Sequence, residues 1–320
     1  MEYTAVIRTL GTSGAKYQSL LESLVSQTLK PQKIIVYIAE GFKIPNETVN
    51  IEQYVYVKKG MVAQRALPYD EVTSEYILFL DDDLYLPPDT VENMFHHLKT
   101  ERADIIAPDV LPNHTRPFLS RCLFSLSGRI RERRNDSVWG YKVMRNSGYS
   151  FNANPIQDCY ISQTNAGACF LCRKQTFLDI KFEEELWMDK MAYAMGDDQV
   201  MYYKMYCGGF KQITWYSHNI LHLDGGGNMT SEKEYKRVKG DVFFKVVFWH
   251  RFIFAPEKSL VKKAYSFLCF SYTLVVLILS SLIRLDMEML RCKVRSIYDA
   301  ICFLQSDEYQ VIPVVNRLTI

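Results

Sequence analysis

Apolar runs and amphipathic stretches alternate over the first two thirds of the chain. Residues 4–9, 33–38 and 76–80 read as strands, and the last of these (YILFL) is continuously apolar, as expected of a central strand covered on both faces. Between the first two runs, apolar residues recur at helical spacing at Tyr17, Leu20, Leu21, Leu24 and Val25. Strands that alternate with helices predict a mostly parallel sheet with right-handed crossovers.

Further elements follow the same alternation. We expect short strands at residues 54–57, 105–106, 168–172 and 211–215. One helix is predicted after Asp89, where Glu92 follows three residues on, and another begins at Asp197 or Asp198 and ends at Gly208-Gly209. The periodicity fades over residues 111–163, which we interpret as an insertion.

The C-terminal part differs in character. Residues 242–254 are aromatic and basic, residues 264–283 contain no charged side chain, and residues 287–304 are amphipathic. The uncharged segment is long enough to cross a bilayer, but it could equally lie in the interface or form a buried core helix. The neighbouring segments favour an interfacial anchor, since a spanning helix would leave basic residues on the far side of the membrane.

Composition narrows the classes of function. With 38 Lys and Arg against 36 Asp and Glu, the net charge of +2 gives no support to nucleic-acid binding. The N-terminal sequence has no secretion signal, so we expect the eight cysteines to be reduced thiols in the cytoplasm. The 21 tyrosines suit carbohydrate stacking or a membrane interface.

Three successive carboxylates, Asp81, Asp82 and Asp83, follow the central strand directly. In such sheets ligands bind beyond the carboxyl ends of the strands. Neighbouring carboxylates repel one another unless a cation is present, and a hard divalent ion completed by a diphosphate would resolve this. The alternative is a solvated acidic turn that leads into the helix after Asp89.

The segments IRTLG, SQTLKPQKIIV, KKGMVAQRALPYDEVTSEYILFLDDD and GDDQ resemble those of family 2 glycosyltransferases. The resemblance covers about residues 5–223 and is most specific around the three aspartates. It implies the glycosyltransferase A-type fold, a Rossmann-like α/β sheet flanked by helices, here with a C-terminal helical extension.

The resemblance also implies roles for individual residues. Asp83, together with Asp81 and a downstream histidine, His222, would hold Mn²⁺ or Mg²⁺. Asp198 would act as general base on the acceptor hydroxyl, with Asp197 beside it; helix capping is the alternative role for this pair. The expected nucleotide contacts are Thr9, Glu40, Arg65, Asp81 and Asp82. Glu40 stands where the family usually has an acidic pair followed by Gly-Ser, so its spacing departs from the pattern.

These inferences divide the chain into three parts. Residues 1–110 would bind the nucleotide sugar, residues 111–230 the acceptor, and residues 231–320 a membrane surface. We expect an inverting, metal-dependent transfer to a glycan or lipid-linked glycan at the cytoplasmic face of a membrane. The enzyme alternative is a nucleotidyltransferase that makes a nucleotide sugar, and the other alternative is a non-catalytic carbohydrate-binding protein. An arginine-rich stretch at 129–134 suggests either solvated surface or contact with anionic groups.

Overall fold

The structure is a computed structural model that describes residues 2–110, 118–126, 138–144, 149–152, 155–193, 195–223 and 230–316. The arginine-rich stretch at 129–134 lies outside the described residues, so its contact with anionic groups stays a prediction.

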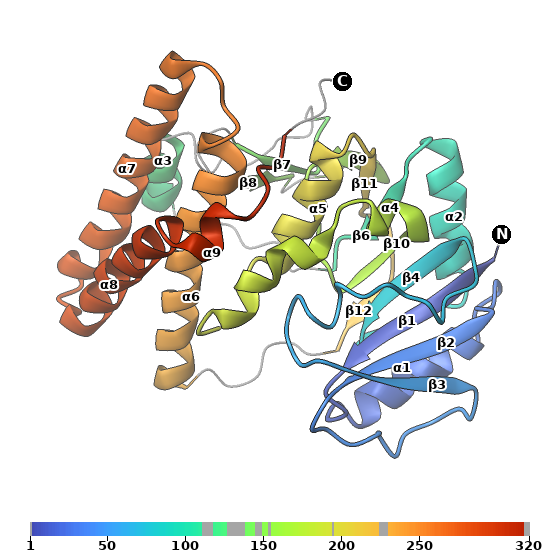
Figure 1. The fold of residues 1–320 in the computed structure, drawn as a ribbon. Coiled ribbons are helices and arrows are strands. Elements are labelled where there is room, and N and C mark those ends of the chain that lie inside the picture. Colours follow the sequence, from blue (N-terminus) through green and yellow to red (C-terminus); the bar gives the residue numbers. More distant parts are fainter. Residues whose placement is uncertain are drawn as a thin grey trace.

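An eight-stranded sheet forms the centre of the molecule (Figure 1), in the order β3-β2-β1-β4-β10-β6-β11-β9. Its strands are β1 Tyr3–Thr9, β2 Lys33–Ala39, β3 Glu52–Val57, β4 Tyr76–Asp81, β6 Ile105–Pro108, β9 Cys159–Ser162, β10 Cys169–Arg173 and β11 Gln212–Trp215. β1 pairs in parallel with β2 and β4, as β2 does with β3 and β6 with β11, whereas β9 and β10 run antiparallel to their neighbours. The predicted α/β fold with a mostly parallel sheet is confirmed.

Helices cover both faces of this sheet. They are α1 Ala15–Val25, α2 Thr90–Thr100, α4 Lys174–Leu178, the 3-10 helix η1 Phe182–Lys190 and α5 Asp197–Cys207. Because side chains alternate along a strand, Ala5 and Ile7 of β1 belong to the buried cluster that includes α1 and α2. Val6, which points to the other face, belongs to the cluster that includes α5. The continuous apolar runs in the sequence follow from burial on both faces.

The insertion contributes α3 Phe118–Leu126 and a small antiparallel pair, β7 Tyr141–Val143 with β8 Tyr149–Phe151. A second small pair joins β5 Leu84–Tyr85 to β12 Leu221–His222. This second pair fixes where the chain passes after β11, since His222 lies opposite Leu84 and therefore next to the end of β4.

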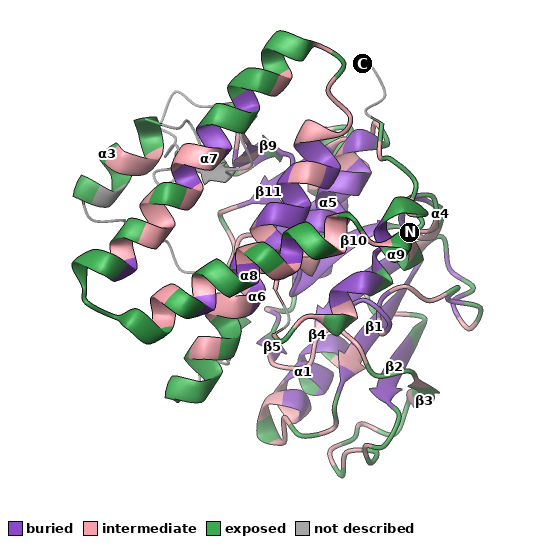
Figure 2. Ribbon diagram, turned by 60° about the vertical axis from the view of Figure 1, so that its left-hand side comes forward, coloured by how far each residue is buried: buried purple, intermediate pink, exposed green. Residues whose placement is uncertain are grey.

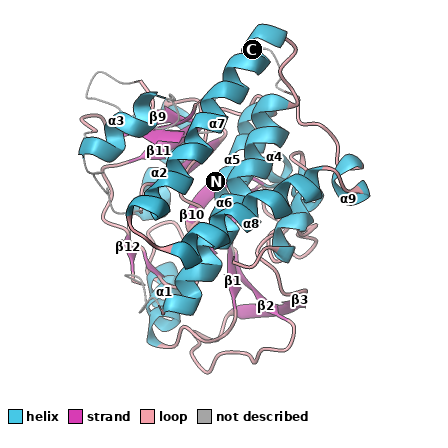
Figure 3. Ribbon diagram, turned by 90° about the vertical axis from the view of Figure 1, so that its left-hand side faces the viewer, coloured by secondary structure: helices cyan, strands magenta, loops and turns pink. Residues whose placement is uncertain are grey.

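The C-terminal region is helical and packs against the domain (Figure 3). It consists of α6 Ser231–Trp249, the π-helix η2 His250–Phe254, α7 Leu260–Ile283, α8 Met287–Leu304 and α9 Asp307–Gln310. By length and composition alone, α7 is the one helix among the described residues that could cross a membrane. A core helix of a soluble protein can have the same length and composition, so its surroundings have to decide between these roles.

Candidate active site

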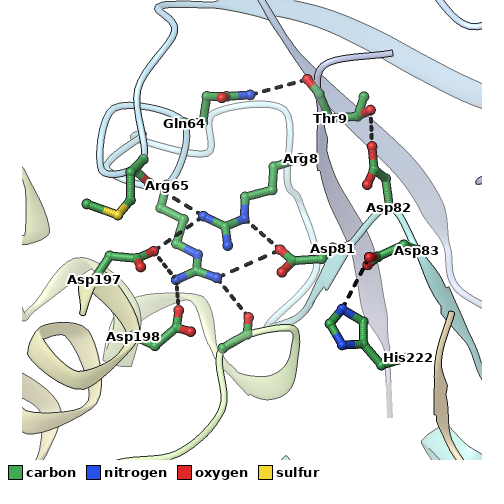
Figure 4. A network of polar contacts seen from close by, with 12 residues as sticks. Arg8, Thr9, Gln64, Arg65, Asp81, Asp82, Asp83, Asp197, Asp198 and His222 are labelled. Carbon is green, nitrogen blue, oxygen red and sulfur yellow. Dashed lines mark hydrogen bonds and ion pairs between the residues drawn. The ribbon is translucent and has the colours of Figure 1, made fainter. Parts of the chain in front are cut away.

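The carboxyl ends of β1 and β4 bring together the first elements of the site (Figure 4). The parallel register sets Arg8 opposite Asp81, and Arg8 Nε donates to Asp81 Oδ1 at 2.7 Å. One residue further on, the Thr9 hydroxyl donates to the Asp82 carboxylate and accepts from Gly11 N at 2.7 Å. Arg8 was not predicted as a site residue. A charged residue inside an apolar strand is a pattern that could have indicated it.

Arg65 lies at the centre of a buried network of charges. Its Nη1 donates to Asp197 Oδ2 at 2.9 Å and to Asp198, while its Nη2 donates to the carbonyl of Gly167 at 2.8 Å. Asp81 Oδ1 lies 3.8 Å from the same guanidinium. Arg8 reaches Asp197 Oδ2 at 3.5 Å. Two arginines and three carboxylates, from β1, β4, the 58–66 loop and α5, therefore form one cluster.

The Asp197-Asp198 pair begins α5, and its two carboxylates differ in environment. The side chain of Asp198 keeps 37% of its surface exposed, against 13% for Asp197. Burial and the charge of Asp198 raise the pKa of Asp197 to about 6. Burial also acts to raise the pKa of Asp198, but the charges of Arg65 and Arg8 outweigh it and hold that pKa below its usual range. Asp198 is thus the more open of the two and stays ionised at neutral pH.

The approach of Asp198 to the end of β4 depends on a missing side chain. A β-carbon at Gly167 would collide with the Asp198 carboxylate. The neighbouring Ala168 accepts a hydrogen bond from Asp81 N at 2.8 Å, which ties this segment to the strand that carries the aspartates. The glycine is therefore required by the close contact of two carboxylate-bearing elements.

A pocket opens to solvent beside this cluster. It is lined by Arg8, Thr9, Leu10, Thr12, Ser13, Gly60, Met61, Gln64, Asp81, Asp82 and Asp83. Burial raises the pKa of Asp82, opposed by the hydrogen bond from Thr9 and reinforced by the two adjacent aspartates. The pocket joins a cationic wall to an acidic one, an arrangement suited to a phosphate-bearing ligand that arrives with a divalent cation.

Asp83, which lines this pocket, is in contact with His222 of β12. His222 Nε2 lies 3.2 Å from Asp83 Oδ2, and Leu223 N donates to the Asp83 carbonyl at 2.7 Å. Asp81, which we expected to bind the metal, instead faces Arg8 and Arg65. In the described part of the chain, no three His, Cys, Asp or Glu side chains gather as a metal site. Within the described ranges, Asp83 and His222 could supply two ligands, and a bound ion would need further oxygens from the substrate.

The remaining predicted residue lies elsewhere. Glu40 is exposed, its N–H donates to Val57 O at 2.8 Å, and it is not among the residues that line the pocket. Asp189 of η1 was not predicted from the sequence; its carboxylate accepts from Val62 N at 2.7 Å and Ala63 N at 3.0 Å. These bonds hold the loop that carries Arg65. No local sequence pattern around Asp189 indicates this role.

A central, mostly parallel sheet flanked by helices, with aspartates at its carboxyl edge, is the architecture of the glycosyltransferase A-type fold. The model of glycosyl transferase family 2 matches residues 18–178, just over half of the chain. The chain therefore belongs to this family, and the protein is a glycosyltransferase.

The similar solved structures include two chains of TarS from S. aureus. One is 12% identical with a TM-score of 0.44, covering 86% of this chain and 43% of that chain. The other, TarS 1-349 in complex with UDP-GlcNAc, is 11% identical with a TM-score of 0.46, covering 98% and 82%. The present chain thus spans less than half of the longer TarS chain. A comparison with curated proteins gives no match.

Proposed function

We propose that the protein transfers a sugar, with inversion, from a nucleoside-diphosphate sugar to a hydroxyl of a glycan or lipid-linked glycan. The observation that carries this proposal is the charge network. It joins the Asp81–Asp83 edge of the donor pocket to Asp198, the open carboxylate at the start of α5. Donor binding and deprotonation of the acceptor can therefore take place at adjoining parts of one site.

Asp198 is the proposed general base. Its carboxylate accepts the proton of the acceptor hydroxyl while the hydroxyl oxygen attacks the anomeric carbon from the face opposite the leaving group. The new glycosidic bond forms as the bond from the anomeric carbon to the phosphate oxygen breaks, and the nucleoside diphosphate departs. The Asp198 carboxylate is ionised at neutral pH, as a base must be before it can accept a proton.

The donor would occupy the pocket at the ends of β1 and β4. The proposed nucleotide contacts are Thr9, Arg65, Asp81 and Asp82, to which the structure adds Arg8; Glu40, exposed outside the lining, is not retained. Arg8 and Arg65 place positive charge near the expected diphosphate. A guanidinium pair next to the leaving group would stabilise the negative charge that develops there.

Asp83 and His222 are the residues that would hold Mn²⁺ or Mg²⁺. The donor set fits a divalent ion in part, because a carboxylate and an imidazole supply two ligands and a diphosphate can supply more oxygens. When bound, such an ion offsets charge on the departing nucleoside diphosphate.

The acceptor and the place of action complete the proposal. We assign donor binding to residues 1–110, acceptor binding to residues 111–230 and membrane contact to residues 231–320. The apolar helix α7 supports a position at a membrane, and we place the protein on the cytoplasmic face, where a lipid-linked acceptor is available.

Thermal unfolding tests the donor site. The purified protein is heated with UDP, GDP, dTDP or CMP, each with and without Mn²⁺. We expect one nucleotide to raise the melting temperature only when metal is present, because a ligand that binds the folded state stabilises it by mass action. The Asp83→Asn variant should lose the metal-dependent part of this shift.

The same ligand then tests the base. Asp198→Asn should keep the melting-temperature shift, while transfer falls by about 10² to 10⁴-fold. Retained transfer in this variant would refute the assignment of the base, and the absence of any nucleotide shift in the parent protein would refute the donor site. Membership of the glycosyltransferase family supports this proposal over a nucleotidyltransferase, and the transfer assay distinguishes it from a non-catalytic carbohydrate-binding protein.

A further inference from the structure

Helix α7 has two faces of opposite character. One face is buried along the length of the helix and carries mostly small or hydroxyl side chains, at Ser266, Cys269, Phe270, Thr273 and Ser281. The other face is exposed and carries large apolar side chains, at Val261, Tyr265, Leu268, Val275, Leu279 and Leu282. These positions are three, four or seven residues apart, and the half-buried Tyr272 lies between Leu268 and Val275, so they fall on one side of the helix.

This arrangement is the reverse of that in a water-soluble helix. A helix at the surface of a soluble protein turns its apolar stripe to the core and its polar residues to water. In α7 the large aliphatic side chains face outward. Helix contacts within membranes, by contrast, use small and hydroxyl side chains, because the lipid outside is as apolar as leucine. The pattern indicates that apolar material covers the outer face of α7.

Helix α3 enlarges the same surface. It contacts α7, although more than 130 positions separate the two helices in the sequence, and it exposes Phe118, Leu119 and Leu126. Figure 2 shows the two helices side by side at one edge of the molecule, with much of their outer surface exposed. We call this surface, formed by α3 and the exposed stripe of α7, the α3–α7 face. A contiguous apolar patch of this kind marks a binding surface for a membrane or a protein.

The charges beside the α3–α7 face favour an anionic lipid surface. Lys258 and Lys262 are exposed at the start of α7, and Arg284 is exposed just beyond its end. A helix of 24 residues is about 36 Å long. These exposed positive charges at the two ends of the apolar stripe would attract an anionic lipid surface.

The packing of α8 argues against a helix that crosses the bilayer. α8 packs against α7, and Lys293 of α8 donates to Leu277 O at 2.9 Å and to Ser280 Oγ at 3.0 Å. α8 also exposes Arg291 and Arg295. If α7 spanned the membrane, these charges would lie within the hydrocarbon, which is costly.

We infer that the α3–α7 face docks on an anionic phospholipid surface, with α7 lying in the plane of the membrane. This inference rests on the proposed location at a membrane and names the surface that makes the contact. α3 belongs to the part of the chain to which we assign acceptor binding. The docked orientation would therefore bring that part close to lipid-linked substrates.

Vesicle binding tests the inference with the full chain. The purified protein is mixed with sealed vesicles of phosphatidylcholine, with or without phosphatidylglycerol, and the bound fraction is measured by flotation. We expect binding to the anionic vesicles. Leu268→Glu should weaken it by about tenfold or more, because a charge replaces an apolar side chain in the interface. Lys262→Glu should weaken binding to the anionic vesicles and leave binding to neutral ones unchanged.

Ile51→Glu is the matched control. Ile51 is 60% exposed and Leu268 67% exposed, so both substitutions place a new carboxylate on the surface, but Ile51 lies next to β3, away from the C-terminal helices (Figure 1). The control should bind vesicles as the parent does. Equal binding by Leu268→Glu and the parent would overturn the inference, as would an equal loss in both variants. Self-association abolished by Leu268→Glu, without vesicle binding, would show that a second copy covers the face instead.

Two further results distinguish this inference from a membrane-spanning orientation of α7 and from the proposed donor site. If the protein inserted into vesicles only in the presence of detergent and then did not exchange between vesicles, the in-plane orientation would be overturned in favour of a spanning one. Asp83→Asn should bind vesicles like the parent, because it lies in the donor pocket. Vesicle binding without any nucleotide-dependent stabilisation would leave the docking face intact and refute the proposed donor site.

Discussion

At the scale of single residues, Arg65 is the side chain on which the site depends most. It is buried, and its two terminal nitrogens serve Asp197, Asp198 and the carbonyl of Gly167 at once. A lysine carries the same charge but has one nitrogen and no planar fork, so it cannot make this set of contacts. The geometry of the proposed base therefore depends on the shape of the arginine as well as its charge.

Arg65→Lys should lower kcat by roughly 10 to 100-fold, since small displacements of a catalytic group have effects of that size. Arg65→Met should in addition lower the free energy of unfolding by about 3–5 kcal/mol, because Asp197 is left buried without its strongest partner. Adding Asp197→Asn to Arg65→Met should recover part of that stability in urea unfolding. No recovery would show that the arginine stabilises the fold through its other contacts.

The raised pKa of Asp197 gives a second prediction at this scale. The folded protein binds the proton of Asp197 with a pKa of about 6, whereas the ordinary value is 3.8, so the folded state holds this proton more tightly. Stability contributed by this group is therefore present at low pH and lost as pH rises from about 4 to about 6, by on the order of 1 kcal/mol per pH unit.

Comparison with Asp197→Asn isolates this effect. The free energy of unfolding of the parent, minus that of the variant, should fall between about pH 4 and pH 6 and stay level above it. Urea unfolding at a series of pH values measures the difference. A difference that rises with pH over this range would mean that the arginines lower the pKa of Asp197 more than its burial raises it.

At the scale of elements, the loop of residues 58–66 is placed by η1. The Asp189 carboxylate accepts from two successive backbone N–H groups of the loop, as a helix-capping side chain does. The loop supplies Gly60, Met61 and Gln64 to the donor pocket and carries Arg65. One carboxylate from a distant helix thus sets the position of one wall of the site.

Asp189→Ala should lower kcat/KM for transfer by about tenfold and the free energy of unfolding by about 1–2 kcal/mol, because two buried N–H groups lose their acceptor. The control is Asp179→Ala, which removes an exposed carboxylate that accepts a hydrogen bond from Gln175 Nε2. It should change neither quantity measurably. If both variants behaved alike, the loop would be held by contacts other than Asp189.

At the scale of the whole molecule, the C-terminal helices belong to the catalytic domain. A single buried cluster includes Val6 and Phe79 of the sheet together with Phe248 of α6 and Phe252 of η2. A buried ion pair also connects the C-terminal helices to the domain, since Arg251 of η2 lies 2.6 Å from Glu185 of η1. The phenyl ring of Phe244 also fills the space beside Gly196, directly before Asp197.

The protein should therefore unfold in one step, and removal of residues 231–320 should leave no folded catalytic domain. Arg251→Met tests the connection without truncation. It leaves Glu185 buried without its arginine, although Lys204 still pairs with it at 3.1 Å, and should cost about 3–5 kcal/mol in urea unfolding. Two separate transitions in the parent protein would instead show that the helices form an independent unit.

Much of the secondary structure could be predicted from the sequence. The apolar run at 76–80 is the strand β4, and the amphipathic stretch at 287–304 has the bounds of α8. Each of these elements is specified by its own residues, because burial of a strand or of one helix face imposes a period that is visible locally. The insertion lacks such a period, and its elements were not predicted.

The chemistry of the site could be predicted only in part. The three aspartates and the Asp197-Asp198 pair were found because they are contiguous in the sequence and similar to a family motif. That Asp81 turns toward Arg8 while Asp83 turns toward His222 could not be found in this way. β4 ends at Asp81 and Asp83 lies in the turn before β5, so the strand period does not determine where Asp83 points. The partners of both residues come from segments distant in the sequence.

By itself, the sequence determined the class of fold, the family and the main carboxylates, because these depend on local periodicity and contiguous motifs. The tertiary structure decided which charges meet. It joined Arg65 to α5, placed Asp189 under the loop and turned the apolar stripe of α7 outward. These features depend on contacts between residues distant in sequence. No pattern within one segment determines them, since each contact arises from how the packed layers bring separate segments together.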